Sequence, residues 1–254
     1  MHERQKLAII IPSFNDARVI KAIRSARVFD DSNVVKVVIV DGGSAPTLID
    51  EISKELTADD LLVSEADDGI FDGFNKGLTL ARDCAFIGWI GSDDYFTGSM
   101  KSSEVLSNLR DADLFIADVL HVAGGVVRRR TPALPSAIGL WRVGLHNPHM
   151  GTFGTSELLC SVSFENSAPA SDVEYFIKVF QRAKKVRFSS TPVVSQTLGG
   201  FSNGSLQKVL RGNKDSFRIY RDHFGFFQAC IAICGKLMLK VLSSVPYYFR
   251  RVPG

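Results

Sequence analysis

The sequence contains little cysteine and tryptophan and no apolar run long enough to cross a membrane. Its 254 residues include 4 Cys and 2 Trp. Cys84, Cys160, Cys230 and Cys234 have neither the spacing of a zinc site nor the density of a disulfide scaffold, so we expect a reducing compartment. Cys230 and Cys234 lie four residues apart, and we expect them to be buried as small hydrophobic residues of a helix.

Several signature motifs are missing as well. No G-x-G-x-x-G follows a predicted strand and no Walker A loop occurs, which argues against dinucleotide oxidoreductases and P-loop enzymes. The apolar run from Leu7 to Ile11 is too short for the core of a signal peptide, so we expect a cytoplasmic protein. The basic residues gather in an apolar tail and not on a sheet studded with aromatics, so we expect no nucleic-acid partner.

Short apolar runs alternate with helical patterns over the first hundred residues. This order predicts an α/β fold with an open, doubly wound sheet, in which ligands bind beyond the carboxyl ends of the strands. At 45% hydrophobic residues, the chain can bury one large domain. The predicted strands are 7–11, 34–40, 61–63 and 86–90, and the predicted helices between them lie around 19–28, 47–56 and 70–82.

The pattern is less regular after residue 120. We expect a strand at 114–120, a helix at 172–183 and short strands at 186–188 and 192–197. The stretch from Gln207 to Arg251 reads as helical, with a break at Gly225 and an end near Pro246.

Polar residues follow each of the first four predicted strands and should meet in one crevice. Asp93 and Asp94 come directly after the fourth strand. Adjacent carboxylates repel each other unless a cation or hydrogen-bond donors compensate them, and a divalent ion bridging nucleotide phosphates would do so. A helix cap or turn is the alternative, and it stays open for Asp41 before its two glycines too.

These strand ends resemble the inverting glycosyltransferase family 2, especially its bacterial polysaccharide- and lipopolysaccharide-assembly members. The resemblance covers residues 7–205 and rests on seven motifs in order. They are I-I-I-P-S-F-N-D (9–16), V-I-V-D-G-G-S (38–44), S-E-A-D-D-G-I-F-D-G-F-N-K-G (64–77), W-I-G-S-D-D-Y-F (89–96), N-P-H-M-G-T-F (147–153), A-S-D-V-E-Y-F (170–176) and G-G-F-S-N (199–203).

The resemblance implies a GT-A fold, Rossmann-like, with a mixed, mainly parallel sheet, helices on both faces and a C-terminal helical extension. It implies a domain at 1–205, with a donor half at about 1–118 and an acceptor half at about 119–205. The charge pattern beyond it predicts a basic amphipathic helical tail at 206–254. The resemblance also implies a nucleotide-sugar donor, favouring UDP, and a surface-glycan or polyprenyl-linked acceptor.

Site residues follow from the same resemblance. Asp94 would ligate Mn²⁺ or Mg²⁺, and Asp172 would be the general base, with Glu174 as its rival. His149, Gly200 and Ser202 would lie on the acceptor side. The nucleotide and donor site would comprise Pro12, Ser13, Asn15, Asp41, Glu65, Asp72, Asn75, Lys76 and Asp93.

The sequence departs from the family pattern at some positions. Gly91-Ser92-Asp93-Asp94 lacks the leading acid of a strict D-x-D, and Met150 replaces a polar residue that many relatives carry. No Q-x-x-R-W follows Gly200, and no region with several membrane spans is present, so a processive synthase is not expected.

The tail joins basic and apolar residues. Lys208, Arg211, Lys214, Arg218 and Arg221 recur every three or four residues before an apolar stretch. Such a helix suits an anionic membrane surface, here the cytoplasmic face of a bacterial inner membrane, and residues 206–251 would bind it. Packing on the domain or on a partner is the alternative, and so are two other functions, a nucleotidyltransferase and a silent transferase-like binding protein.

Overall fold

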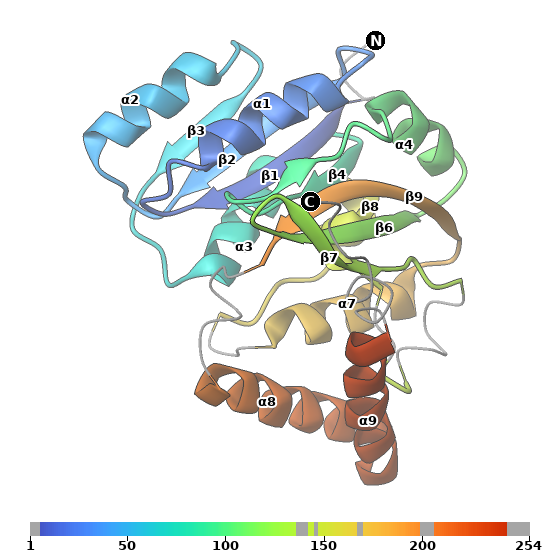
Figure 1. Ribbon diagram of the computed structural model, residues 1–254. Coiled ribbons are helices and arrows are strands. Elements are labelled where there is room, and N and C mark those ends of the chain that lie inside the picture. The colour runs from blue at the N-terminus through green and yellow to red at the C-terminus, as the bar shows by residue number, and fades with distance from the viewer. Residues whose placement is uncertain (1–5, 136–141, 145–146, 167–169, 199–205, 243–254) are drawn as a thin grey trace, which may run out of the picture.

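A nine-stranded sheet with helices on both faces forms the body of the protein (Figure 1). The computed structural model describes residues 6–135, 142–144, 147–166, 170–198 and 206–242. The strand order is β3-β2-β1-β4-β8-β6-β9-β5, and β7 pairs with β6.

The amino-terminal half is parallel. β1 (Leu7–Ser13) pairs with β2 (Val35–Asp41) and β4 (Phe86–Trp89), and β2 pairs with β3 (Leu61–Ser64). Right-handed crossovers place α1 (Val19–Phe29) and α2 (Pro46–Glu55) on one face, and the reversal from β3 to β4 places α3 (Ile70–Leu80) on the other. β1 is buried along its whole length because both faces are covered, which confirms the expectation from its apolar run.

The second half mixes strand directions. β6 (Leu114–Ala123) runs parallel to β9 (Val186–Thr197) and antiparallel to β7 (Val126–Thr131) and β8 (Thr152–Thr155). β5 (Tyr95–Phe96) pairs antiparallel with β9. The predicted division between donor and acceptor halves, at residues 118 and 119, falls inside β6 and stays a prediction.

One strand assignment was wrong. Residues 186–197 were expected to form two short strands, but β9 is continuous. Its register against β6 shifts on either side of Asp118: the pairing skips Ser190 and Thr191 before Asp118 and Val193 after it. A β-bulge therefore absorbs the polar residues that suggested a break.

Aromatic packing positions α7 (Ser171–Arg182) beneath the sheet. Trp89 at the end of β4 lies 5.9 Å from the Tyr175 ring and 5.7 Å from the Phe176 ring, and Phe164 stacks on Tyr175 at 3.9 Å. These rings fix the first turn of α7 relative to the strand that precedes Asp93. The remaining short elements are α4 (Ser102–Leu109), the 3₁₀ turn η2 (His149–Gly151) and α6 (Ser156–Leu159).

The tail is a helical pair that packs on the domain. α8 (Leu206–Phe224) and α9 (Phe226–Leu242) break at Gly225, whose φ of +89° favours glycine, and this confirms the predicted break. The predicted end near Pro246 lies outside the described residues. The expectation for Cys230 and Cys234 was wrong, because both are exposed. Within the described helices, none combines the length and apolarity needed to cross a bilayer.

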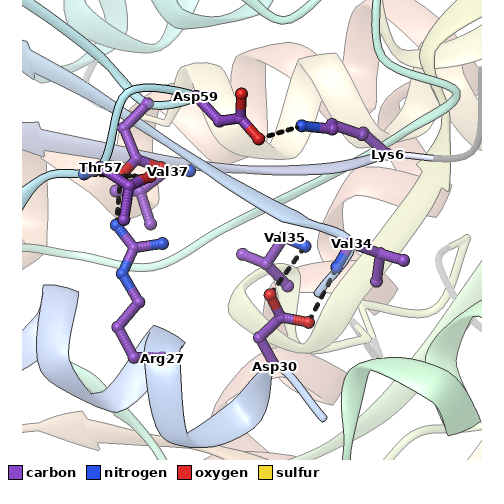
Figure 2. A network of polar contacts seen from close by, with 9 residues as sticks. Lys6, Arg27, Asp30, Val34, Val35, Val37, Thr57 and Asp59 are labelled. Carbon is purple, nitrogen blue, oxygen red and sulfur yellow. Dashed lines mark hydrogen bonds and ion pairs between the residues drawn. The ribbon is translucent and has the colours of Figure 1, made fainter. Parts of the chain in front are cut away.

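The edge of the first half is held by a network of carboxylates (Figure 2). Asp60 is buried and accepts hydrogen bonds from the Val37 N–H at 2.8 Å and the Thr57 N–H at 2.6 Å, and it pairs with Arg27. The neighbouring Asp59 is exposed and pairs with Lys6 at 2.5 Å. The two adjacent aspartates thus both make ion pairs, but the Asp60 carboxylate is buried and the Asp59 carboxylate is exposed to solvent.

We predict that Asp60→Ala lowers the free energy of unfolding by about 3–5 kcal/mol, because it leaves Arg27 and the N–H groups of Val37 and Thr57 without their buried acceptor. Urea denaturation would measure this change. Asp59→Ala is the matched control and should change stability little, because its ion pair is exposed to solvent. Equal effects of the two substitutions would contradict this view of the network.

Candidate active site

Three parallel strands end in register at one edge of the sheet. Ser13 of β1 pairs with Asp41 of β2, and Asp41 pairs with Ser64 of β3. The loop after β4 carries Asp93 and Asp94 at the same edge. The polar strand ends expected from the sequence therefore lie side by side.

Asp41 is fully buried and engaged by its own loop. Its Oδ2 accepts hydrogen bonds from the N–H groups of Gly43 and Ser44 and from the Ser64 hydroxyl, at 3.0, 2.7 and 2.8 Å. Its Oδ1 accepts the Ser44 hydroxyl at 2.5 Å. Through these bonds Asp41 stabilises the conformation of the loop after β2.

The loop after β1 presents the other residues predicted to contact the nucleotide. Asn15 is exposed with a φ of +48°, and its N–H donates to the Ser44 hydroxyl at 2.7 Å. Pro12 is buried beneath α3, where a Cβ on Gly73 would lie 3.3 Å from it. The Ser13 hydroxyl is buried with no hydrogen-bond partner within the described residues, so it keeps its bonding capacity.

The segment before and within α3 forms a charged cluster. Lys76 Nζ lies 3.0 Å from Glu65 and 3.3 Å from Asp72, and it donates to the Ala66 carbonyl at 3.0 Å. Glu65 is exposed at the rim, so its carboxylate is accessible to a ligand.

Asn75 differs from its neighbours because it joins two distant segments. Its Oδ1 accepts the Phe164 N–H at 2.8 Å, and its Nδ2 donates to the Phe164 carbonyl at 2.9 Å. Both ends of the amide are therefore used, and Asn75 fixes α3 to the segment that leads into α7. We call this contact the Asn75 clamp.

Asp94 is a buried carboxylate between two parts of the sheet. It is 2% exposed, and it accepts hydrogen bonds from the Gly91 N–H at 3.1 Å and the Thr197 N–H at 2.9 Å. Burial raises the pKa of Asp94 to about 6, and the charge of Asp93 acts in the same direction, against the hydrogen bonds from Thr197 and Gly91. A positive charge on His149 also favours the ionised form of Asp94.

Asp93 has a more open environment shaped by Arg18. Burial raises the pKa of Asp93, and Arg18 opposes that shift from 3.3 Å. Arg18 is itself held by Asp16, which accepts its Nε at 2.8 Å and also accepts the Ser92 hydroxyl at 2.8 Å. Arg18, Asp16 and Ser92 were not predicted as site residues, although Asp16 and Ser92 lie inside the quoted motifs.

His149 connects the metal-side and base-side candidates. Its Nδ1 lies 3.4 Å from Asp172 Oδ2, and its ring stacks on Phe176 at 5.8 Å. Its main-chain carbonyl accepts Trp89 Nε1 at 2.7 Å, which fixes η2 against β4. Its Nε2 is buried with no hydrogen-bond partner in the described part of the chain. An imidazole nitrogen in that state is available to a substrate or a ligand.

The two candidate bases point to different neighbours. Asp172 faces His149, whereas Glu174 pairs with Lys178 at 2.7 Å and lies 3.9 Å from His223 of α8. Residues two apart on a helix do not share a face, so the pair separates as geometry requires. The acceptor-side candidates Gly200 and Ser202 lie outside the described residues.

The carboxylate pair can contribute ligands to a divalent ion, but does not enclose one. No cluster of three or more His, Cys, Asp or Glu within the described ranges could hold a metal ion. Asp93 Oδ2 is buried without a hydrogen bond there, 3.3 Å from Arg18, and Asp94 has a raised pKa. Two hard oxygen ligands with further ligands from a diphosphate suit Mn²⁺ or Mg²⁺.

Comparison with known families gives a broad match. The model of the family described as Glycosyl transferase family 2 matches residues 8–210, most of the chain. No curated protein sequence matches.

Solved structures share the fold at low sequence identity. TarS from S. aureus aligns with a TM-score of 0.58 and 16% identity over 85% of this chain, which spans only 39% of the TarS chain. TarS 1–349 with UDP gives 0.60 and 15%, covering 92% of this chain and 71% of that one. The mannosyltransferase PcManGT from Pyrobaculum calidifontis, with GDP-Man and Mn²⁺, gives 0.58 and 14%, covering 99% and 78%. These likenesses establish the GT-A fold.

The raised pKa of Asp94 predicts how the stability of the metal-free protein depends on pH. The unfolded chain releases this proton near 3.8, whereas the folded protein holds it to about 6. Unfolding therefore becomes easier as pH rises between these values, by roughly 3 kcal/mol, and the effect is complete above pH 6.

Urea denaturation of metal-free protein from pH 4 to 7 measures this slope, and Asp94→Asn should flatten it. Asp222→Asn on α8 is the control and should keep the slope of the wild type. A slope that persists unchanged in Asp94→Asn would place its origin elsewhere.

Proposed function

The chain belongs to glycosyltransferase family 2, and on that premise we propose an inverting, metal-dependent transfer of one sugar from a UDP-sugar to an acceptor hydroxyl. The chain is a glycosyltransferase that uses a nucleotide-sugar, and family membership favours this over nucleotidyl transfer. The proposed acceptor is a surface glycan or a polyprenyl-linked glycan. One observation supports the proposal most. His149 contacts Asp172, the candidate base, at 3.4 Å, and its main-chain carbonyl accepts Trp89 Nε1 at the end of the strand that precedes Asp94, the candidate metal ligand.

Asp93 and Asp94 would hold the metal together with the diphosphate of the donor. Mn²⁺ or Mg²⁺ bound there would supply charge that stabilises the departing nucleoside diphosphate. The presence of Mn²⁺ beside GDP-Man in PcManGT, a protein of the same fold, supports this assignment. Arg18 lies 3.3 Å from Asp93 and favours its ionised form, against the burial that raises the pKa of Asp93.

Asp172 would act as the general base. Its carboxylate accepts the proton of the acceptor hydroxyl while the oxygen attacks the anomeric carbon from the face opposite the leaving group. The bond from the anomeric carbon to the phosphate oxygen breaks, and the electron pair leaves with the nucleoside diphosphate. His149 orients Asp172 through Nδ1, and Glu174 is held away from the site by Lys178.

The other predicted residues divide into direct and indirect contacts. Ser13 and Asn15 would contact the base and ribose, and Glu65 the donor, because each offers an accessible or unsatisfied polar group. Asp41 and Asn75 would act indirectly, because their polar atoms already bind protein. Pro12, Asp72 and Lys76 would line the donor site, and His149, Gly200 and Ser202 the acceptor side.

We predict that Asp172→Asn lowers transfer by about 10²- to 10⁴-fold, because general base catalysis contributes that much. Transfer would be measured with radiolabelled UDP- and GDP-sugars and bacterial lipid-linked glycans. Glu174→Gln is the matched control and should keep most of the activity. Calorimetry with UDP and Mn²⁺ should show unchanged donor binding in Asp172→Asn and weaker binding in Asp94→Asn. Full transfer by Asp172→Asn would reject the assignment of the base.

We propose further that the tail binds an anionic membrane on the cytoplasmic face. α9 packs one face on the domain, since a Cβ on Gly235 would lie 1.8 Å from the Val143 carbonyl. The same helix also exposes apolar side chains, with Phe227 85% and Ile231 51% exposed. On α8 the exposed cations include Arg211 and Lys214. Apolar and basic surfaces on adjoining helices suit the interface of an anionic bilayer.

We predict that the double substitution Phe227→Ser and Ile231→Ser weakens binding to phosphatidylglycerol vesicles at least 10-fold. Burying each apolar side chain contributes about 1.5–3 kcal/mol. Flotation would measure binding. Val28→Ser on α1, at a position that is 65% exposed, is the control and should bind like the wild type. Equal flotation of the double variant and the wild type would reject membrane docking through α9.

A further inference from the structure

Two consecutive arginines on β7 have contrasting environments. Arg130 donates from Nε to the buried carboxylate of Asp118 and from its NH2 group to the Ser190 carbonyl. Arg129 projects from the opposite face of the strand, where its NH2 group lies 3.2 Å from His121 Nε2. Arg129 has no carboxylate partner in the described part of the chain.

The cation of Arg129 is thus partly buried with no carboxylate against it among the residues that the structure describes. Its Nε is buried with no hydrogen-bond partner within the described residues, and burial lowers its pKa. Burying an unpaired charge costs free energy, so such a group is expected to have a partner. The segments outside the described residues contain Glu3 as their acidic residue, and residues 136–141 and 199–205 contain no Asp or Glu. The chain therefore offers few internal anions for this guanidinium.

Strand register places Arg129 near the active site. His121 of β6 pairs with Arg129 on one side and with Gln196 of β9 on the other. Thr197, the next residue of β9, donates its N–H to Asp94. Neighbouring strands lie about 4.8 Å apart, so the Arg129 backbone lies about 10 Å from that of Gln196.

The side chain of Arg129 lies on the face that carries the candidate base. Val119 and His121 share one face of β6 because they are two residues apart. A Cβ on Gly151 of η2 would lie 3.0 Å from Val119 Cγ2, so η2 covers this face. η2 begins with His149, which contacts Asp172. Arg129 therefore lies on the same side of the sheet as the predicted acceptor site.

We propose that Arg129, with His121 and Thr131, forms a subsite for a phosphate group carried by the acceptor. The Thr131 hydroxyl lies 2.8 Å from His121 Nε2, so hydroxyl, imidazole and guanidinium stand together. A phosphate offers several acceptor oxygens, which match the fork of a guanidinium and an adjacent hydroxyl. The inference rests on the proposed function and specifies its acceptor as phosphorylated. The donor diphosphate belongs to Asp93 and Asp94, which β9 and β6 separate from Arg129.

The test uses full-length protein saturated with UDP and Mg²⁺, with binding followed by phosphorus NMR and calorimetry. The probe is glycerol 1-phosphate, and glycerol is its neutral counterpart. The wild type should bind glycerol 1-phosphate without displacing UDP, and it should not bind glycerol. Arg129→Gln should weaken probe binding about 10- to 100-fold, as expected for loss of a charged hydrogen bond, and Arg129→Lys less.

Arg128→Gln is the matched control, because Arg128 is an exposed arginine of the same strand, and it should bind the probe like the wild type. The proposal is overturned if the wild type does not bind the probe, if Arg129→Gln binds it equally, or if UDP competes with it. Binding of inorganic phosphate without glycerol 1-phosphate would identify a site for the free ion and also reject it. UDP affinity, measured separately in each variant, distinguishes these outcomes from failure of the donor site itself.

Discussion

The Asp94 carboxylate is the constraint on which the candidate site depends. It joins the loop after β4 to the end of β9 by accepting one N–H from each. β4 belongs to the parallel half of the sheet and β9 to the mixed half, so the Asp94 carboxylate links the two halves. Burial raises the pKa of this carboxyl group, so its ionised form is disfavoured there. A cation at that point compensates charge that the fold has already concentrated there. The proposed metal binding and the joining of the two halves would thus depend on the same carboxylate.

Several polar side chains around the site stabilise its loops and helices. Asp41 and Asn75 lie in motifs that resemble a donor site, yet their polar atoms bind the protein itself. The groups left unsatisfied in the described residues, among them the Ser13 hydroxyl, Asp93 Oδ2 and His149 Nε2, come from three separate elements around one edge. Polar groups that already bond to the protein stabilise the shape of the site, whereas buried polar groups without a hydrogen-bond partner are the ones that a ligand can bind.

The sequence predicted the elements well and the contacts between them less well. The strands from Leu7 and Val35, the helix with Asp172 and the break at Gly225 follow from apolar periodicity and glycine chemistry, which are local. The two strands expected on either side of Ser190 and Thr191 form one continuous strand. Pairing with β6 tolerates a bulge there, whereas the local sequence pattern alone indicated the end of a strand. Arg18 beside Asp93 and Thr197 beside Asp94 could not be inferred. A lone Arg or Thr carries no local signal, and Thr197 lies far from Asp94 along the chain.

The Asn75 clamp separates the residues that position the candidate base from those at the rim of the site. One amide fixes α3 to Phe164, whose ring stacks on Tyr175 in the helix that carries Asp172. Asn75 on α3 thereby helps to position the helix that carries the candidate base, whereas Glu65, which follows β3, is exposed at the rim and pairs with Lys76. Substitution of Glu65, a proposed donor contact, would therefore leave intact the two bonds between Asn75 and Phe164 that help to position the candidate base. Such a chain could change its proposed donor contacts by substitution at the rim and keep the position of its candidate base.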